Sequence, residues 1–136
     1  MVVLSAPKIE ILAQAKDPKR ALIDAIGDLA GVDVLSDLVL VGTFIRHEKT
    51  AGGIIRPREN VQEDEHQGKA GLVLKAGPYA YSEWESDDVR GQNARLHSWV
   101  VYQIAHSWPL QINGVPCRLV PYEKLRMRVA DPNLVF

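Results

Sequence analysis

Apolar residues near the start of the chain follow a helical period. Between residues 22 and 29 they recur at steps of three and four, which is typical of an amphipathic helix. Asp17 is placed to cap the N-terminus and Pro18 suits the first helical position. Gly31 offers a glycine stop. We therefore predict one amphipathic helix over 18–30, too short to be stable without a surface to pack on.

The first sixteen residues carry a weaker pattern. Ile9, Ile11 and Ala13 alternate with other residues, which favours an extended arm or a strand. We treat residues 1–33, the arm and the helix, as an extension. The main domain is expected to span residues 34–136.

From Asp37 onward the pattern is that of a β protein. Short segments rich in β-branched and large apolar residues alternate with turn residues. Asn113-Gly114 is a strong hairpin signal. Short strands without helices between them predict a barrel or a sandwich. The expected strands cover 38–45, 71–76, 99–104, 111–115, 117–120 and 125–129.

Two long polar connections interrupt these strands, at 47–68 and 77–95. A connection of this length inside a compact domain is usually functional or disordered. In the second, Glu83, Glu85 and Asp87 alternate, but no late glutamate completes a calcium loop. We therefore expect no calcium site in this second loop.

The first connection contains an apolar pair in polar surroundings. Gly52 and Gly53 make the backbone permissive, and Ile54 and Ile55 follow at once, before Arg56. Exposed aliphatic residues of this kind suit an anchor that a partner's groove buries. The alternative is a loop that folds back and packs both isoleucines onto its own barrel.

Composition narrows the function. The chain of 136 residues has 16 Lys and Arg against 17 Asp and Glu, so no basic excess favours nucleic acid. Cys117 is the single cysteine, which suits a reducing compartment and a buried structural role. The four histidines lack metal-ligand spacing, and no catalytic triad or phosphate-binding loop is recognised. We expect no enzyme activity, cofactor, metal or membrane span, and a cytoplasmic protein.

The segment Lys49 to Pro57 resembles the mobile loop of GroES-type (chaperonin-10) co-chaperonins, in which a Gly-Gly pair precedes a short aliphatic tripeptide. The flanking segments resemble the family in the same order. Those similar segments are 34–41, 68–78, 95–102 and 113–120, so the resemblance covers about residues 34 to 132.

Three features depart from the family pattern. Arg56 replaces the third aliphatic residue of the tripeptide, and His97-Ser98 stands where the family has Gly-Asp. Residues 1–33 have no counterpart in the bacterial family. Such divergence is similar to that of phage-encoded relatives.

The resemblance implies a mostly β protein, with a GroES-like, partly open barrel and a mobile loop at 47–68. The residue pattern adds the N-terminal arm and one amphipathic helix. It implies a co-chaperonin that caps a GroEL-like chaperonin ring and assists folding. Gly52, Gly53, Ile54, Ile55 and Arg56 would contact that partner. A ring of identical subunits is expected, with Leu38, Leu40, Leu125 and Met127 in its interface or in the core.

A structural role is the alternative. The arm, the helix and the incomplete tripeptide also fit a phage virion protein, such as a capsid decoration or cement subunit on the same barrel. Its partner would be the capsid protein and its location the virion.

Overall fold

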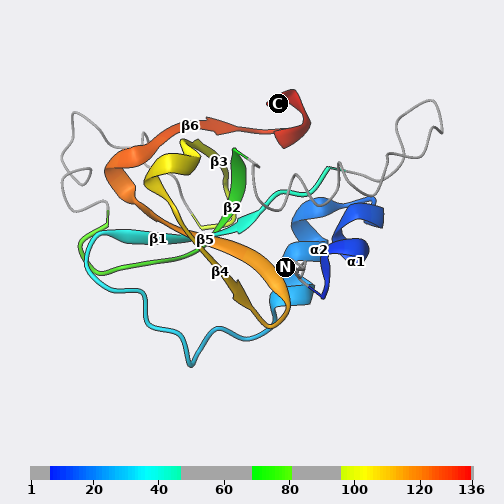
Figure 1. The fold of residues 1–136 in the computed structure, drawn as a ribbon, viewed down its shortest axis with the longest axis horizontal. Helices are drawn as coiled ribbons and strands as arrows, with labels where there is room; N and C mark the ends of the chain where they lie inside the picture. The colour runs from blue at the N-terminus through cyan, green and yellow to red at the C-terminus, as the bar shows by residue number, and fades with distance from the viewer. Residues whose placement is uncertain (1–6, 47–68, 81–95, 136) are drawn as a thin grey trace, which may run out of the picture.

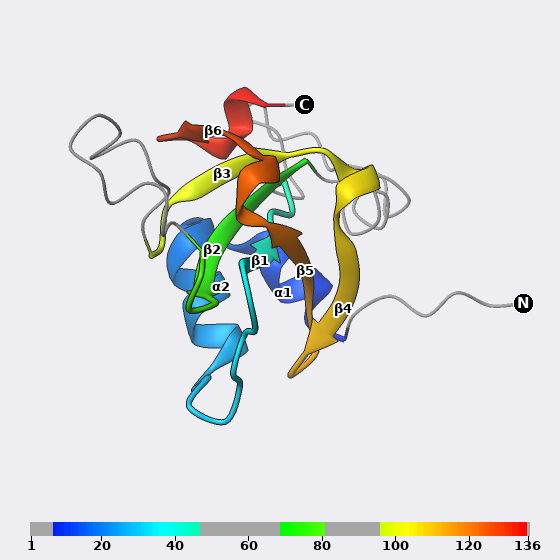
Figure 2. The ribbon, with the colours of Figure 1, turned by 90° about the vertical axis from the view of Figure 1, so that its left-hand side faces the viewer.

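The computed structural model describes residues 7–46, 69–80 and 96–135, and these form a curled β-sheet with two helices against it (Figure 1). Six antiparallel strands lie in the order β4-β5-β1-β2-β3-β6. The sheet is open, because β4 and β6 form its two edges (Figure 2). The strands are β1 (Leu38–Thr43), β2 (Ala70–Ala76), β3 (Trp99–Tyr102), β4 (Trp108–Ile112), β5 (Val115–Pro121) and β6 (Leu125–Val129).

The mostly β fold is confirmed, and the tight hairpin falls where expected. Asn113 and Gly114 join β4 to β5 with φ values of 51° and 76°. Both lie in the left-handed region that a two-residue hairpin turn of this class requires. The third strand is shorter than predicted: β3 ends at Tyr102, and a 3₁₀ turn occupies Ile104–His106.

The predicted helix starts correctly and ends early. In α2 (Pro18–Ile26) the Asp17 carboxylate accepts a hydrogen bond from the Arg20 backbone N–H at 3.3 Å. The helix stops at Gly27, which has φ 73°, so Gly31 is the wrong stop. Contacts from distant parts of the chain end it here. Lys8 Nζ donates to Ala25 O at 2.6 Å, and Asn113 Nδ2 donates to Ala25 O and Ile26 O, each at 3.3 Å.

The extended arm predicted for the N-terminal segment is wrong for its described part, where α1 (Ile9–Gln14) is a helix. Its apolar residues follow the 3.6-residue period, since Ile9, Leu12 and Ala13 are buried while Ile11 is 62% exposed. The Lys8 N–H donates to Gly114 O at 2.9 Å, which ties the helix start to the β4–β5 hairpin. A six-residue helix of this kind depends on such tertiary contacts.

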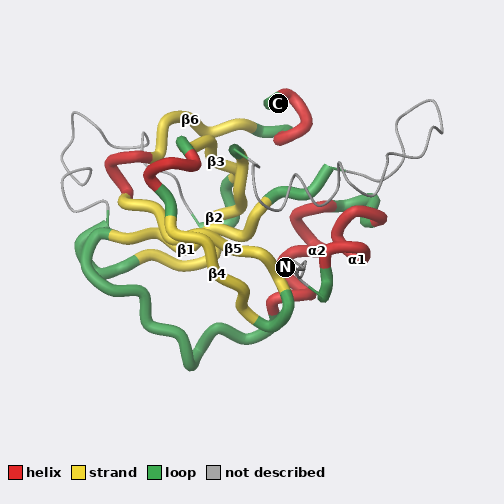
Figure 3. Tube along the Cα trace, in the orientation of Figure 1, coloured by secondary structure: helices red, strands yellow, loops and turns green. Residues whose placement is uncertain are grey.

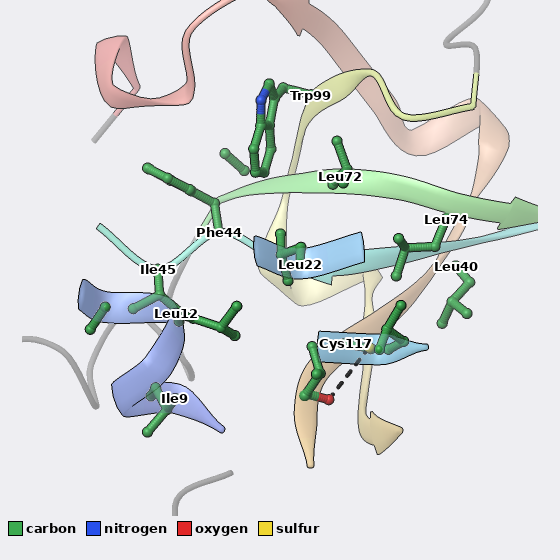
Figure 4. Packing of buried hydrophobic residues seen from close by; sticks show 14 of the residues in the cluster. Ile9, Leu12, Leu22, Leu40, Phe44, Ile45, Leu72, Leu74, Trp99 and Cys117 are labelled. Carbon is green, nitrogen blue, oxygen red and sulfur yellow. Dashed lines mark hydrogen bonds between the residues drawn. The ribbon is translucent and has the colours of Figure 1, made fainter. Parts of the chain in front are cut away.

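Both helices lie on the same side of the sheet (Figure 3). The closest approach is at Gly42 of β1, where an added Cβ would lie 3.2 Å from the Leu22 side chain of α2. Leu22 therefore packs directly over the strand (Figure 4). The sequence predicted that the helix needs a surface to pack on, and that surface is the sheet. The buried apolar residues of α1 and α2 belong to the same core as those of the sheet.

The sheet is buried on both faces. On the helix side, Leu40 and Phe44 join the apolar residues of α1 and α2. On the other side, valines from four strands pack against Tyr102 and Tyr122, which the curl of the sheet encloses. This second core consists of Val39, Val41, Val73, Ala80, Val100, Tyr102, Val120 and Tyr122.

Candidate functional site

The predicted partner-binding residues Gly52, Gly53, Ile54, Ile55 and Arg56 lie outside the described residues, but both ends of their segment are described. Because β1 and β2 are neighbouring antiparallel strands, the connection leaves and re-enters the sheet at one end. The Phe44 N–H donates to Ala70 O at 3.0 Å and closes the base of the connection.

This base is firmly packed. Phe44 and Ala70 are 0% exposed and Ile45 is 3% exposed. The Phe44 ring meets the Trp99 ring edge-to-face, with 5.3 Å between centroids. Ile45 lies over α1, close to Leu12 (Figure 4). The described residues next to the two ends of the 47–68 segment are therefore held in place by packing and by the Phe44–Ala70 hydrogen bond.

The four residues assigned to interface or core take different places. Leu40 is 1% exposed and belongs to the core, and Leu38 is partly buried. Both lie on β1, which pairs with β2 on one side and β5 on the other. Leu125 is partly buried, and Met127 is 49% exposed on β6. Only β6, of these two strands, is an edge that a further strand could extend.

Part of the helix-side face is left uncovered by α1 and α2. Two hollows of about 220 and 340 Å³ adjoin there and share Leu38 and Leu119 as lining. Trp108 is 73% exposed and Leu35 is 68% exposed beside them. We call this region the apolar sheet surface. It consists of Leu35, Leu38, Leu110, Leu119, Trp108 and Pro121.

Sequence reasoning missed this surface. The signal was present, because Trp108-Pro109-Leu110 is an apolar run directly before the predicted hairpin. Which face of a strand such residues occupy, and whether a helix covers them, depends on the tertiary arrangement. Exposed apolar residues that gather in one region favour a site of interaction.

A small cluster of polar side chains lies in the interior of the curled sheet. Arg118 is 4% exposed, and its Nη1 donates to the Ser107 hydroxyl at 2.9 Å. Burial raises the pKa of Tyr102 to about 12, against an opposing effect of the nearby Arg118 charge and the Thr43 hydroxyl. Within the described residues, neither the Thr43 nor the Tyr102 hydroxyl makes a hydrogen bond of standard geometry.

Cys117 is not built as a nucleophile. Its side chain is 2% exposed and its thiol faces Val115 O at 3.5 Å (Figure 4). Burial raises the pKa of this thiol to about 12, so the reactive thiolate is scarce at neutral pH. This agrees with the structural role expected from the sequence.

The raised pKa values of the Cys117 thiol and the Tyr102 phenol predict that the folded protein loses stability at alkaline pH. The thiol and the phenol of the unfolded chain ionise near 9.0 and 10.0, whereas the folded forms hold their protons to about 12. Stability is therefore complete below pH 9 and falls as the pH rises towards 12. The slope approaches about 1.4 kcal/mol per pH unit for each group.

Denaturant unfolding between pH 8 and 11 checks this prediction. Tyr102→Phe should remove the part of the slope above pH 10, and Cys117→Ala should remove the part that begins near pH 9. A wild-type unfolding free energy that stays constant across this range would contradict it.

The described residues contain neither a cluster of metal-ligating side chains nor a helix that could span a membrane. No group of three or more His, Cys, Asp or Glu there is arranged to hold a metal ion. Among the described helices, none has the length and apolar character needed to cross a membrane.

Comparisons with known proteins add no relative. No protein-family model matches this chain. No curated protein matches it either.

Proposed function

We propose that this protein is a co-chaperonin of the GroES type, which caps a chaperonin ring through the 47–68 segment. The observation that carries the proposal is the placement of this segment. Its Gly-Gly-Ile-Ile sequence lies in a long polar connection between β1 and β2, whose ends are held by buried residues and the Phe44–Ala70 hydrogen bond.

A backbone feature at the start of β3 supports the family resemblance. His97 has φ 62°, in the left-handed region that favours glycine. It occupies the position at which the family carries the glycine of its Gly-Asp pair. The backbone of this chain thus has, at that position, a conformation that glycine adopts readily, although the residue differs.

The energetics require a multimer. Burying both isoleucines yields roughly 3–6 kcal/mol, while ordering a segment on binding costs roughly 2–5 kcal/mol. A single segment therefore binds weakly, and several presented together bind tightly through effective concentration. The open edges β4 and β6 are compatible with a ring, since head-to-tail pairing of different edges forms a ring when the rotation between subunits closes.

In such a ring, β6 brings Met127 to the subunit interface, opposite β4 of the neighbour, whereas Leu125 packs against the core inside the curl. Leu38 and Leu40 stay within the subunit, because β1 already pairs on both sides. In the proposed ring, neighbouring subunits therefore meet through β6 and β4, and not through β1.

A refolding assay with a GroEL-type chaperonin and ATP tests the proposal. We expect the wild type to raise the yield of a stringent client, and Ile54→Asp/Ile55→Asp to abolish the gain, because a charged residue enters an apolar groove poorly. Val61→Asp is the matched control, with the same type of change in the same segment. A wild type that gives no gain removes the proposal.

The apolar sheet surface favours the virion structural protein as a second candidate. Trp108 and Leu35 would be covered by a capsid protein rather than by a chaperonin. Trp108→Asp should then prevent attachment to the shell, while Ile54→Asp/Ile55→Asp should preserve it. The co-chaperonin role predicts instead that Ile54→Asp/Ile55→Asp abolishes chaperonin binding.

A further inference from the structure

The turn between β4 and β5 is joined to the end of α2 by side-chain hydrogen bonds. Asn113 Nδ2 donates to Ala25 O and to Ile26 O, each at 3.3 Å. A Cβ added at Gly27, where α2 ends, would lie 3.6 Å from the same nitrogen. Both acceptors are carbonyl groups of the last turn of the helix, which find no donor within the helix itself. The Asn113 amide therefore supplies hydrogen bonds that α2 cannot provide alone.

Lys8 reinforces this contact from the start of α1. Its Nζ donates to Ala25 O at 2.6 Å, so it shares an acceptor with the Asn113 amide. Its backbone N–H donates to Gly114 O at 2.9 Å, and a Cβ added at Gly114 would lie 3.3 Å from the Lys8 side chain. The start of α1, the end of α2 and the hairpin turn thus meet at one place. We call this contact the hairpin joint, formed by Lys8, Ala25, Ile26, Asn113 and Gly114.

The turn is also the sequence at which an asparagine side chain reacts most readily with its own backbone. Asn113-Gly114 is the single Asn-Gly pair of the chain, and glycine leaves its backbone nitrogen unhindered because it has no side chain. That nitrogen can attack the side-chain carbonyl carbon of Asn113 to form a cyclic imide. The side-chain nitrogen leaves as ammonia and takes the amide proton of Gly114. Water then opens the imide to aspartate or isoaspartate, so water is the one co-reactant.

The closed joint opposes this reaction. Ring closure requires the Asn113 side chain to swing towards the Gly114 nitrogen, whereas its amide is held at α2 by two hydrogen bonds. The backbone is also fixed, with φ 51° at Asn113 and 76° at Gly114, between the paired residues Ile112 and Val115. Asn113 is exposed, so water reaches the turn. Opening of the joint is therefore the step that the fold controls.

We infer that Asn113 is a deamidation site whose rate is set by opening of the hairpin joint, and whose products weaken that joint. Neither product has the NH₂ group that donates to Ala25 O and Ile26 O. The new carboxylate also lies at the negative end of the α2 dipole, which repels it. The change is irreversible and loosens α2 from the hairpin. The inference uses no residue of the 47–68 segment and does not rest on the co-chaperonin role.

Mass spectrometry of the full chain tests the rate, after incubation at neutral pH and digestion with trypsin. The expected peptide spans residues 96–118, in which Asn113 is the sole asparagine, and an unincubated sample gives the baseline. We expect the folded protein to deamidate roughly tenfold more slowly, or slower still, than the protein in urea, because only the open fraction reacts. Equal rates in the two conditions would overturn the inference.

Lys8→Met tests control by the joint, since it removes the bond from Nζ to Ala25 O and leaves the Asn113-Gly114 sequence intact. The folded variant should deamidate roughly fivefold faster than the wild type, as expected when one hydrogen bond no longer holds the closed state. In urea the two proteins should react at the same rate. Lys16→Met is the matched control, because it removes the same charge from an exposed position between α1 and α2. A Lys8→Met protein no faster than Lys16→Met would refute control by the joint.

Asn113→Asp tests the effect of the product. We expect its melting temperature to be lower than that of the wild type, because the amide donor is lost and a negative charge is added at the end of α2. Asn113→Gly is the control, since it removes the same donor without adding charge and Gly-Gly suits this class of turn. It should melt between the two. An Asn113→Asp protein that melts with the wild type would show that deamidation leaves the joint intact, against the inference.

Discussion

Gly77→Ala is expected to lower the free energy of unfolding by about 3 kcal/mol or more, which is at the upper end for steric insertions into packed regions. An added Cβ would clash with Ser36 O and would lie 2.8 Å from Leu35 O. These are backbone atoms, so no rotamer change relieves the contact. The same turn is fixed by hydrogen bonds from the Gly77 N–H to Leu38 O at 2.8 Å and from the Tyr79 N–H to Ser36 O at 2.9 Å.

Gly31→Ala is the matched control for this prediction. No atom lies within 4 Å of a Cβ added there, and Gly31 has no positive φ. Its stability should change by about 0.5 kcal/mol or less, in the range of surface substitutions. Urea unfolding of both variants provides the measurement, and a Gly77→Ala protein as stable as Gly31→Ala would show that the 35–38 turn yields freely.

Leu40→Ala is expected to destabilise the protein by about 2–5 kcal/mol, as buried leucine truncations do. Leu40 is 1% exposed and packs in the helix-side core. The loss should be independent of protein concentration, because the side chain is buried within one chain. Chemical denaturation at two concentrations tests both points.

Met127→Ala is the contrasting variant. Met127 is 49% exposed on the edge strand β6, so the stability of the isolated subunit should change by about 1 kcal/mol or less. In the proposed ring, assembly should be affected instead, which analytical ultracentrifugation would detect as a lower mass at a given concentration. A Met127→Ala protein that assembles normally and a Leu40→Ala protein of normal stability would reverse the assignment.

The two expected effects separate core from interface among residues that share one sequence character. Leu38, Leu40, Leu125 and Met127 all lie in apolar strand segments. Strand order distinguishes them, since β1 is central and β6 is an edge. Pairing order results from contacts between distant segments, such as β3 with β6, and the residues of one strand do not encode it.

The candidate surfaces were predictable to different degrees. The Gly-Gly-Ile-Ile motif stands out as a local run, and its position between β1 and β2 follows from strand spacing. The apolar sheet surface was not predictable, since the exposure of Trp108 depends on which part of the sheet the helices cover.

The error at α1 has a specific cause. Ile9, Ile11 and Ala13 alternate, but Leu12 completes a helical spacing with Ile9, and the two periods compete over so short a segment. Packing decided between them, as Leu12 is 4% exposed and Ile11 is 62% exposed.

By itself, the sequence determined the features that depend on neighbouring residues: the Asp17–Pro18 helix start, the Asn113-Gly114 turn and the positions of most strands. Capping and turn geometry act within a few residues, so local chemistry is sufficient there. The tertiary structure decided that α1 is helical, that α2 ends at Gly27 and that β1 lies at the centre. Those outcomes depend on contacts between distant parts of the chain, such as Lys8 with Ala25 and Asn113 with Ile26, which form only once the sheet and helices have packed.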